Sequence, residues 1–167
     1  MEVKDVCFVR HAKSSWDQPG LKDFDRPLDS RGLHDAPMMA RKMKELGLIP
    51  DYIISSGANR AKSTAEYFRQ EFDLSRDHFE INNDLYEASA ETVYEVLRSA
   101  PDTAKFVFLF GHNPTFTWVA NSIAGVHIDE VPTCGIVHAQ AMISSWSKFK
   151  PEYAGFIGFH YPKQYKK

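Results

Sequence analysis

The sequence predicts an α/β fold with a mostly parallel central sheet, helices on both faces of the sheet, and C-terminal edge strands. Short apolar runs alternate with segments of helical periodicity through the first two thirds of the chain. One of these runs, ending at Phe110, is continuously apolar, as in a strand covered on both faces. From Gly135 to Trp146 apolar and polar residues alternate instead, and a shorter aromatic strand follows from Gly155 to Tyr161. This last pattern favours paired strands at the edge of the sheet.

Composition limits the class of protein. The 167 residues, of which 43% are hydrophobic and 25% charged, suit one folded domain spanning 1–167. A net charge of −2 argues against nucleic acid as a partner. Cys7 and Cys134 lie far apart among apolar residues, which favours reduced core thiols. No segment approaches the roughly 20 apolar residues of a membrane span, so we expect no membrane partner and a cytoplasmic location.

The first strand ends abruptly in two unusual side chains. The apolar run from Val6 to Ala12 contains Arg10 and His11, and a Gly-, Pro-, Ser- and Asp-rich loop follows over 13–28. A helix capped by Asp29 or Ser30 and ended by Gly47 comes next. Its helically spaced apolar positions are Leu33, Ala36, Met39, Ala40, Met43 and Leu46.

The following elements repeat the strand–helix alternation. A strand over 51–55 and a turn over 56–60 lead into a helix, a short strand over 79–81 leads to another, and Pro114 opens a helix after the strand that ends at Phe110. The apolar positions expected to face inward on these helices are Ala61, Ala65, Phe68 and Phe72, then Val93, Val96, Leu97 and Ala100, then Phe116, Val119, Ala120 and Ile123.

Strand ends carry similar side chains at three places. Arg10 and His11 end the first strand, Arg60 follows the second, and His112 follows the strand that ends at Phe110. Ends of parallel strands meet at one edge of a sheet, so these four residues are expected to converge. Two guanidinium forks, a helix N-terminus and imidazoles suit a phosphoryl group, with one imidazole free to attack phosphorus. No Gly-rich phosphate loop, HExxH motif or cysteine ligand set occurs, so no metal or cofactor is expected.

Four motifs, in order, carry a resemblance to a known family. They are Val9–Trp16 (VRHAKSSW), Asp25–Leu28 (DRPL) with Arg31-Gly32, Ser55–Ala65 (SSGANRAKSTA) and Gly111–Pro114 (GHNP). Together they resemble branch 1 of the histidine phosphatase superfamily, and the KSSW variant is most similar to its phosphohistidine phosphatase (SixA) group.

The resemblance implies a phosphoglycerate mutase-like fold and metal-independent hydrolysis of a phosphohistidine protein or a small phosphorylated molecule. It makes His11 the nucleophile that is transiently phosphorylated, with Arg10, Arg60 and His112 as the phosphate pocket. Glu87 is the nearest match to the carboxylate that protonates the leaving group in many members.

Two further loop residues are candidates for substrate contact. Arg26 lies between Asp25 and Pro27, where a loop salt bridge is the alternative to a substrate contact. Lys13 follows the catalytic strand, where it either adds positive potential at the pocket mouth or is a solvated loop lysine. A pocket short of a general acid would favour P–N or aryl-phosphate substrates, because these leaving groups need less protonation than an alkoxide.

Two other functions remain open from the sequence. One is a phosphoglycerate mutase-like phosphotransferase, for which the chain is short and lacks the long insertions of an acceptor site. The other is a non-catalytic phosphate-binding sensor, which would have no need of His11. The sequence leaves the oligomeric state and the physiological substrate undetermined.

Overall fold

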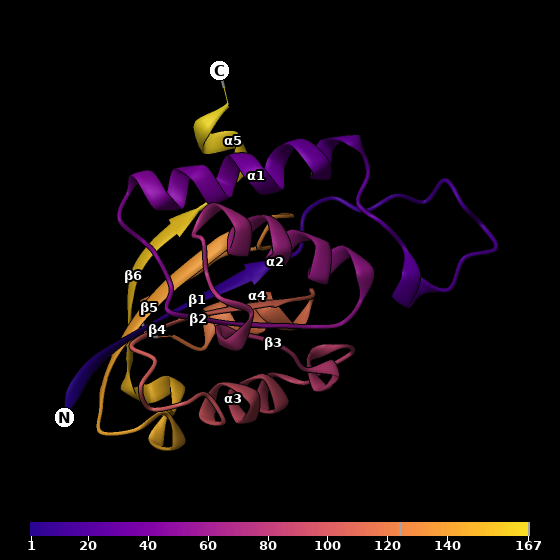
Figure 1. The fold of residues 1–167 in the computed structure, drawn as a ribbon. Coiled ribbons are helices and arrows are strands. Elements are labelled where there is room, and N and C mark those ends of the chain that lie inside the picture. Colours follow the sequence, from indigo (N-terminus) through magenta and orange to yellow (C-terminus); the bar gives the residue numbers. More distant parts are fainter. Residues whose placement is uncertain (124, 167) are drawn as a thin grey trace.

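A six-stranded sheet organises the chain, in the order β3-β2-β4-β1-β5-β6 (Figure 1). The computed structural model describes residues 1–123 and 125–166. The strands are β1 (Glu2–Arg10), β2 (Tyr52–Ser55), β3 (Phe79–Ile81), β4 (Phe106–Gly111), β5 (Ile136–Ile143) and β6 (Ala154–His160). The helices are α1 (Ser30–Glu45), α2 (Asn59–Glu71), α3 (Ala90–Arg98), α4 (Thr115–Asn121) and α5 (Pro162–Tyr165).

Strand directions confirm the predicted sheet. β3, β2, β4 and β1 are parallel, whereas β5 and β6 are antiparallel additions on the far side of β1. Arg10 lies opposite Gly111, and Ser55 lies opposite Phe110. The register therefore brings the carboxyl ends of β1, β2 and β4 to one edge of the sheet.

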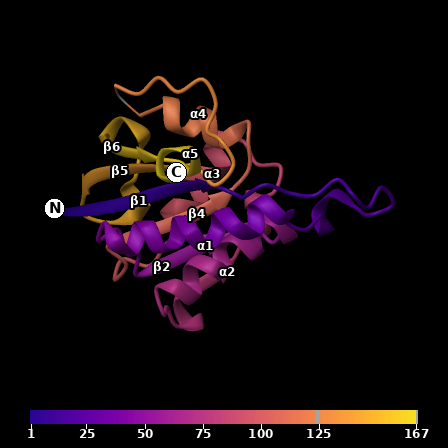
Figure 2. The ribbon, with the colours of Figure 1, turned by 90° about the horizontal axis from the view of Figure 1, so that it is seen from above.

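Helices cover both faces, as the alternating pattern predicted. In Figure 1, α1 and α2 lie above the sheet and α3 lies below it; Figure 2 shows α1 and α2 side by side. Successive residues of β1 divide between two cores, since Cys7 and Val9 pack with α1 and α2 whereas Val6 and Phe8 pack with α3 and α4. Because β1 is buried on both faces, its last residues are held rigidly. No helix within the described residues is long and apolar enough to span a bilayer.

Helix α1 begins as predicted and buries the predicted Ala36, Met39, Ala40 and Met43, but the prediction is wrong at its two outer positions. Asp29 caps it by accepting a hydrogen bond from the Gly32 amide at 2.8 Å. Leu33 and Leu46, expected to be buried, are 49% and 47% exposed. Gly32 and Asp35 take the inward positions instead, one turn before the buried stripe of Ala36, Met39, Ala40 and Met43. That shift presses Gly32 against the loop after β1, where a Cβ atom would lie 2.2 Å from the Lys13 carbonyl oxygen.

Candidate active site

The three strand ends place four polar side chains around one point. His11 follows β1 and His112 follows β4, with 5.2 Å between their ring centroids. Arg60 lies in the first turn of α2, and Arg10 is the last residue of β1. His11 and Arg60 are each only 7% exposed. The sequence expectation that Arg10, His11, Arg60 and His112 share one edge of the sheet therefore matches the arrangement seen.

His11 is held in a single tautomer. Its Nδ1 lies 2.7 Å from the Ala12 carbonyl oxygen, and a carbonyl only accepts, so Nδ1 carries the proton. Nε2 is then free of a proton and carries the lone pair of the ring. Burial, with the charges of Arg60 and Arg10 adding to it, lowers the pKa of His11 to about 3. The ring is therefore neutral at physiological pH, which a nitrogen nucleophile requires.

His112 is oriented by Ser56. The Ser56 hydroxyl oxygen lies 2.9 Å from His112 Nε2 and accepts a hydrogen bond from the Ala58 amide. When this hydroxyl donates to Nε2, the proton of the neutral His112 ring lies on Nδ1. Burial and the nearby Arg60 lower the pKa of His112 to about 4, so it is a neutral donor.

Two buried side-chain nitrogens at this site lack a hydrogen-bond partner among the described residues, Nδ1 of His112 and Nε of Arg10. Arg10 itself is fixed by its Nη1, which donates to the Val131 carbonyl at 2.9 Å and to Glu130 at 3.3 Å. Buried donors without acceptors are costly, and such exceptions call for an explanation. Both donors are available to an anion.

Arg60 has a partner that the sequence analysis did not identify. Its Nη1 donates to the backbone carbonyl of Asp23 at 2.7 Å, and its Nη2 donates to the Asp23 carboxylate at 2.9 Å. The same carboxylate accepts the Tyr86 hydroxyl at 2.6 Å and Arg26 Nη1 at 3.0 Å. These hydrogen bonds, that of Tyr86 foremost, hold the pKa of Asp23 well below its usual range, so it is ionised. Asp23 lies two residues before the start of the DRPL motif, and this proximity is the one feature of the sequence that points to it.

The other predicted site residues are less directly connected to the two histidines. Arg26 is 8% exposed, donates to Ser14 and Ser15 as well as to Asp23, and stacks on Trp16 at 3.3 Å. These contacts match its alternative role as a loop brace.

Lys13 is half-buried, and its backbone carbonyl receives the Asp29 amide. Glu87 is exposed, has a φ of 54°, and directly follows Tyr86, whose ring meets His112 edge-on at 5.6 Å. Tyr86, also missed from the sequence, thus stands on the side of the site where Glu87 was expected.

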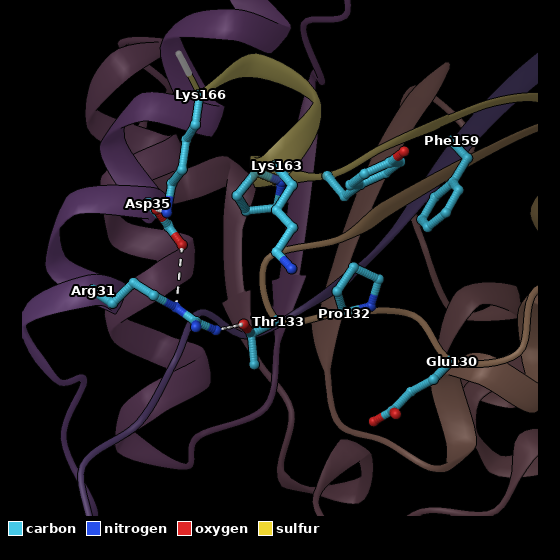
Figure 3. Close-up of a pocket in the computed structure, with 10 residues that line it drawn as sticks. Arg31, Asp35, Glu130, Pro132, Thr133, Phe159, Lys163 and Lys166 are labelled. Atoms are coloured by element: carbon cyan, nitrogen blue, oxygen red, sulfur yellow. Dashed lines mark hydrogen bonds and ion pairs between the residues drawn. The ribbon is translucent and has the colours of Figure 1, made fainter.

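A depression of about 410 Å³ lies beside the site, between α1 and the chain after β6 (Figure 3). Glu130 on its rim is the residue that pairs with Arg10, and Arg31 crosses it to donate to Thr133 at 3.1 Å. Lys163 points into it, and Phe159 and Pro132 form an apolar wall. The depression therefore combines charged side chains of both signs with apolar surface, beside the ion pair of Glu130 and Arg10.

A family model of the histidine phosphatase superfamily (branch 1) matches residues 6–94, which include Arg10, His11 and Arg60. The chain belongs to this superfamily. An uncharacterized chloroplastic protein of Arabidopsis thaliana is similar to this histidine phosphatase, at 30% identity over 152 residues, covering 86% of this chain and 69% of the relative.

Solved structures place this histidine phosphatase within the SixA group. A SixA-type protein of Agrobacterium tumefaciens has 26% identity and a TM-score of 0.80, with 95% of this chain and 98% of that chain covered. The protein histidine phosphatase SixA complexed with tungstate has 21% identity and a TM-score of 0.80, over 97% and 99% of the two chains. The family and the fold identify the protein as a phosphatase, with the phosphoglycerate mutase-like architecture of SixA.

Proposed function

We propose that this phosphatase hydrolyses a phosphohistidine protein or a small phosphorylated molecule through a phosphohistidine intermediate on His11. One observation carries the proposal: the Nδ1–H of His11 is bound to the Ala12 carbonyl, which leaves a neutral Nε2 beside two buried donors without acceptors. A neutral nucleophile and buried hydrogen-bond donors for the phosphoryl oxygens are what phosphoryl transfer needs.

In the first step the Nε2 lone pair of His11 attacks phosphorus. An N–P bond forms, the P–N bond of the substrate breaks, and the leaving imidazole nitrogen keeps the electron pair and takes up a proton. Arg10, Arg60 and His112 hold the phosphoryl oxygens, whose charge spreads as the bond breaks. The hydrogen bond from Nδ1 to Ala12 stabilises the positive charge that the phosphorylated ring acquires.

In the second step water attacks the phosphorylated His11. The water oxygen bonds to phosphorus, the N–P bond breaks, and the electron pair returns to Nε2. Inorganic phosphate leaves with one proton retained from the water, and the other proton is released to solvent. His11 is then restored to the neutral tautomer held by Ala12.

The carboxylates near the site favour a substrate that needs little help from an acid. Asp23 and Glu130 both face arginines, and Glu87 is exposed. A protonatable imidazole leaves phosphorus far more readily than an alkoxide does. We therefore expect P–N and aryl-phosphate substrates to react faster than alkyl phosphate monoesters.

The two cysteines favour a reducing cellular compartment. Cys7 and Cys134 are both unpaired and completely buried, which suits a cytoplasmic enzyme. We include the cytoplasm in the proposal on this ground.

The proposal is tested by comparing three substrates with the purified protein. These are a chemically phosphorylated histidine peptide, p-nitrophenyl phosphate and an alkyl phosphate, each assayed with and without an added alcohol. We expect phosphate to be released fastest from the phosphorylated histidine peptide, more slowly from p-nitrophenyl phosphate and slowest from the alkyl phosphate. We expect no phosphorylated alcohol to form. Transfer to the alcohol as the main product would identify a phosphotransferase instead. Tight binding of the phosphopeptide without turnover, unchanged in His11→Ala, would identify a sensor.

A further inference from the structure

We propose that Asp23 is a positioning residue, which holds the Nη1 and Nη2 end of the Arg60 guanidinium so that the side carrying Nε–H faces the phosphoryl group. The inference rests on the proposed function, because it assigns to Arg60 a phosphoryl ligand. It extends the site to the loop over 13–28. Asp23 lies in the part of this loop between the motifs VRHAKSSW and DRPL.

Both hydrogen bonds of Arg60 leave from the same end of its guanidinium, the end that carries Nη1 and Nη2. Nη1 and Nη2 donate to two oxygens of one residue, the Asp23 carbonyl and carboxylate. A guanidinium has five N–H donors in a rigid fork, so this contact uses one N–H from each Nη. The Nε–H and the outer Nη protons have no acceptor among the described residues. Those donors remain for phosphoryl oxygens.

Three side chains hold the Asp23 carboxylate in place, although it is 48% exposed. Its carboxylate receives hydrogen bonds from Tyr86 at 2.6 Å and from Arg26 at 3.0 Å, in addition to that from Arg60. Arg26 is buried and anchored to Ser14 at 2.6 Å, close to the nucleophilic strand. Moving Asp23 away from Arg60 would break all of these charge-assisted contacts together.

The two buried donors of the site are not hydrogen-bonded to Asp23. Nε of Arg10 and Nδ1 of His112 are the buried unpartnered donors, and Asp23 touches neither of them in the described residues. A phosphoryl group that satisfies these two donors needs only the side of Arg60 that carries Nε–H. Asp23 therefore acts through Arg60, as an orienting group, and does not compete with the substrate.

The Tyr86 hydroxyl gives Asp23 a second link to the site. The Tyr86 ring meets His112 edge-on, and the hydrogen bond to Asp23 raises the pKa of Tyr86 to about 12, so the hydroxyl stays a donor. One carboxylate thus joins the loop over 13–28, the first turn of α2 and the segment before α3. Loss of its charge should loosen Arg60 without removing Arg60.

The test uses Asp23→Asn, with Asp25→Asn as a matched control. Asp25 lies in the same single turn, is exposed, and its carboxylate has no partner among the described residues. We expect Asp23→Asn to lower kcat on p-nitrophenyl phosphate by about ten- to hundredfold, the usual cost of a small misplacement, and Asp25→Asn to leave kcat unchanged. Vanadate inhibition should weaken in Asp23→Asn.

A double mutant separates positioning from a merely structural role. In an Arg60→Ala background, Asp23→Asn should lower kcat no further, because its effect passes through Arg60. A full additional loss in that background would overturn the inference, as would wild-type kcat in Asp23→Asn alone. A lower KM with tighter vanadate inhibition would also overturn it, since that result would show a competing carboxylate.

Two further measurements keep the result interpretable. If Asp23→Asn unfolds, Tyr86→Phe removes a single hydrogen bond to the same carboxylate, and we expect a smaller loss of kcat with the thermal midpoint retained; an unchanged kcat would then overturn the inference. A wild-type protein inactive on every phosphorylated substrate would refute the proposed function itself. An active wild type with no effect of either substitution would refute only the role of Asp23.

Discussion

Replacing His11 should change how the stability of the protein depends on pH. An unfolded histidine has a pKa near 6.5, whereas His11 has a pKa of about 3 in the folded protein. Above about pH 6.5 neither state binds the proton, and no free energy is lost. As the pH falls below this value only the unfolded state binds the proton, so folding stability drops. At about pH 5 the cost of keeping His11 neutral is about 2 kcal/mol, from about 1.4 kcal/mol per pH unit.

The variant His11→Asn lacks this cost. Between about pH 8 and about pH 5, we expect its free energy of unfolding to rise by about 2 kcal/mol relative to that of the wild type. Urea unfolding at both pH values measures the difference, and His127→Asn at the surface serves as the control. An identical difference between wild type and His11→Asn at both pH values would refute the argument that His11 is buried and neutral.

Three other substitutions test neighbouring parts of the account. Arg60→Lys should lower kcat/KM on p-nitrophenyl phosphate by about 10²-fold, since lysine lacks the planar fork; steady-state rates within threefold of wild type would contradict this. Gly32→Ala should reduce the free energy of unfolding by about 1–3 kcal/mol, because its Cβ meets the Lys13 carbonyl oxygen at 2.2 Å; an unchanged urea midpoint would show that the contact relaxes freely. Glu87→Gln should leave kcat on phosphohistidine unchanged, because Glu87 is exposed and the leaving imidazole needs little help from an acid; a loss of kcat on this substrate would identify Glu87 as the acid.

The residues at strand ends could be predicted because the pattern that marks them is local. An apolar run that stops at Arg10 and His11 identifies a buried strand and its exit, and parallel strands share an exit edge. The same reasoning placed Arg60 and His112, which are separated from His11 by long stretches of chain. The fold class could be predicted because apolar strand-like runs alternate with segments of helical periodicity, a pattern that does not depend on details of side-chain packing.

Asp23 and Tyr86 could not be predicted in the same way. The hydrogen bond between them joins residues 63 positions apart, and both lie in short irregular segments without hydrophobic periodicity. Leu33 was assigned to the core because its spacing fits a helix, yet Asp35 occupies the inward side, held by Lys166 at 2.8 Å. An ion pair with the C-terminal segment cannot be read from the periodicity of α1.

The most direct test of the central claim is to trap the phosphorylated enzyme. The protein is mixed with the phosphorylated histidine peptide, quenched in alkali, digested, and examined by mass spectrometry and ³¹P NMR. We predict an acid-labile, alkali-stable phosphoryl group on His11, bonded to Nε2 because Nδ1 is held by the Ala12 carbonyl. Phosphorylation at Nδ1, on another residue, or undiminished turnover in His11→Asn would contradict the account.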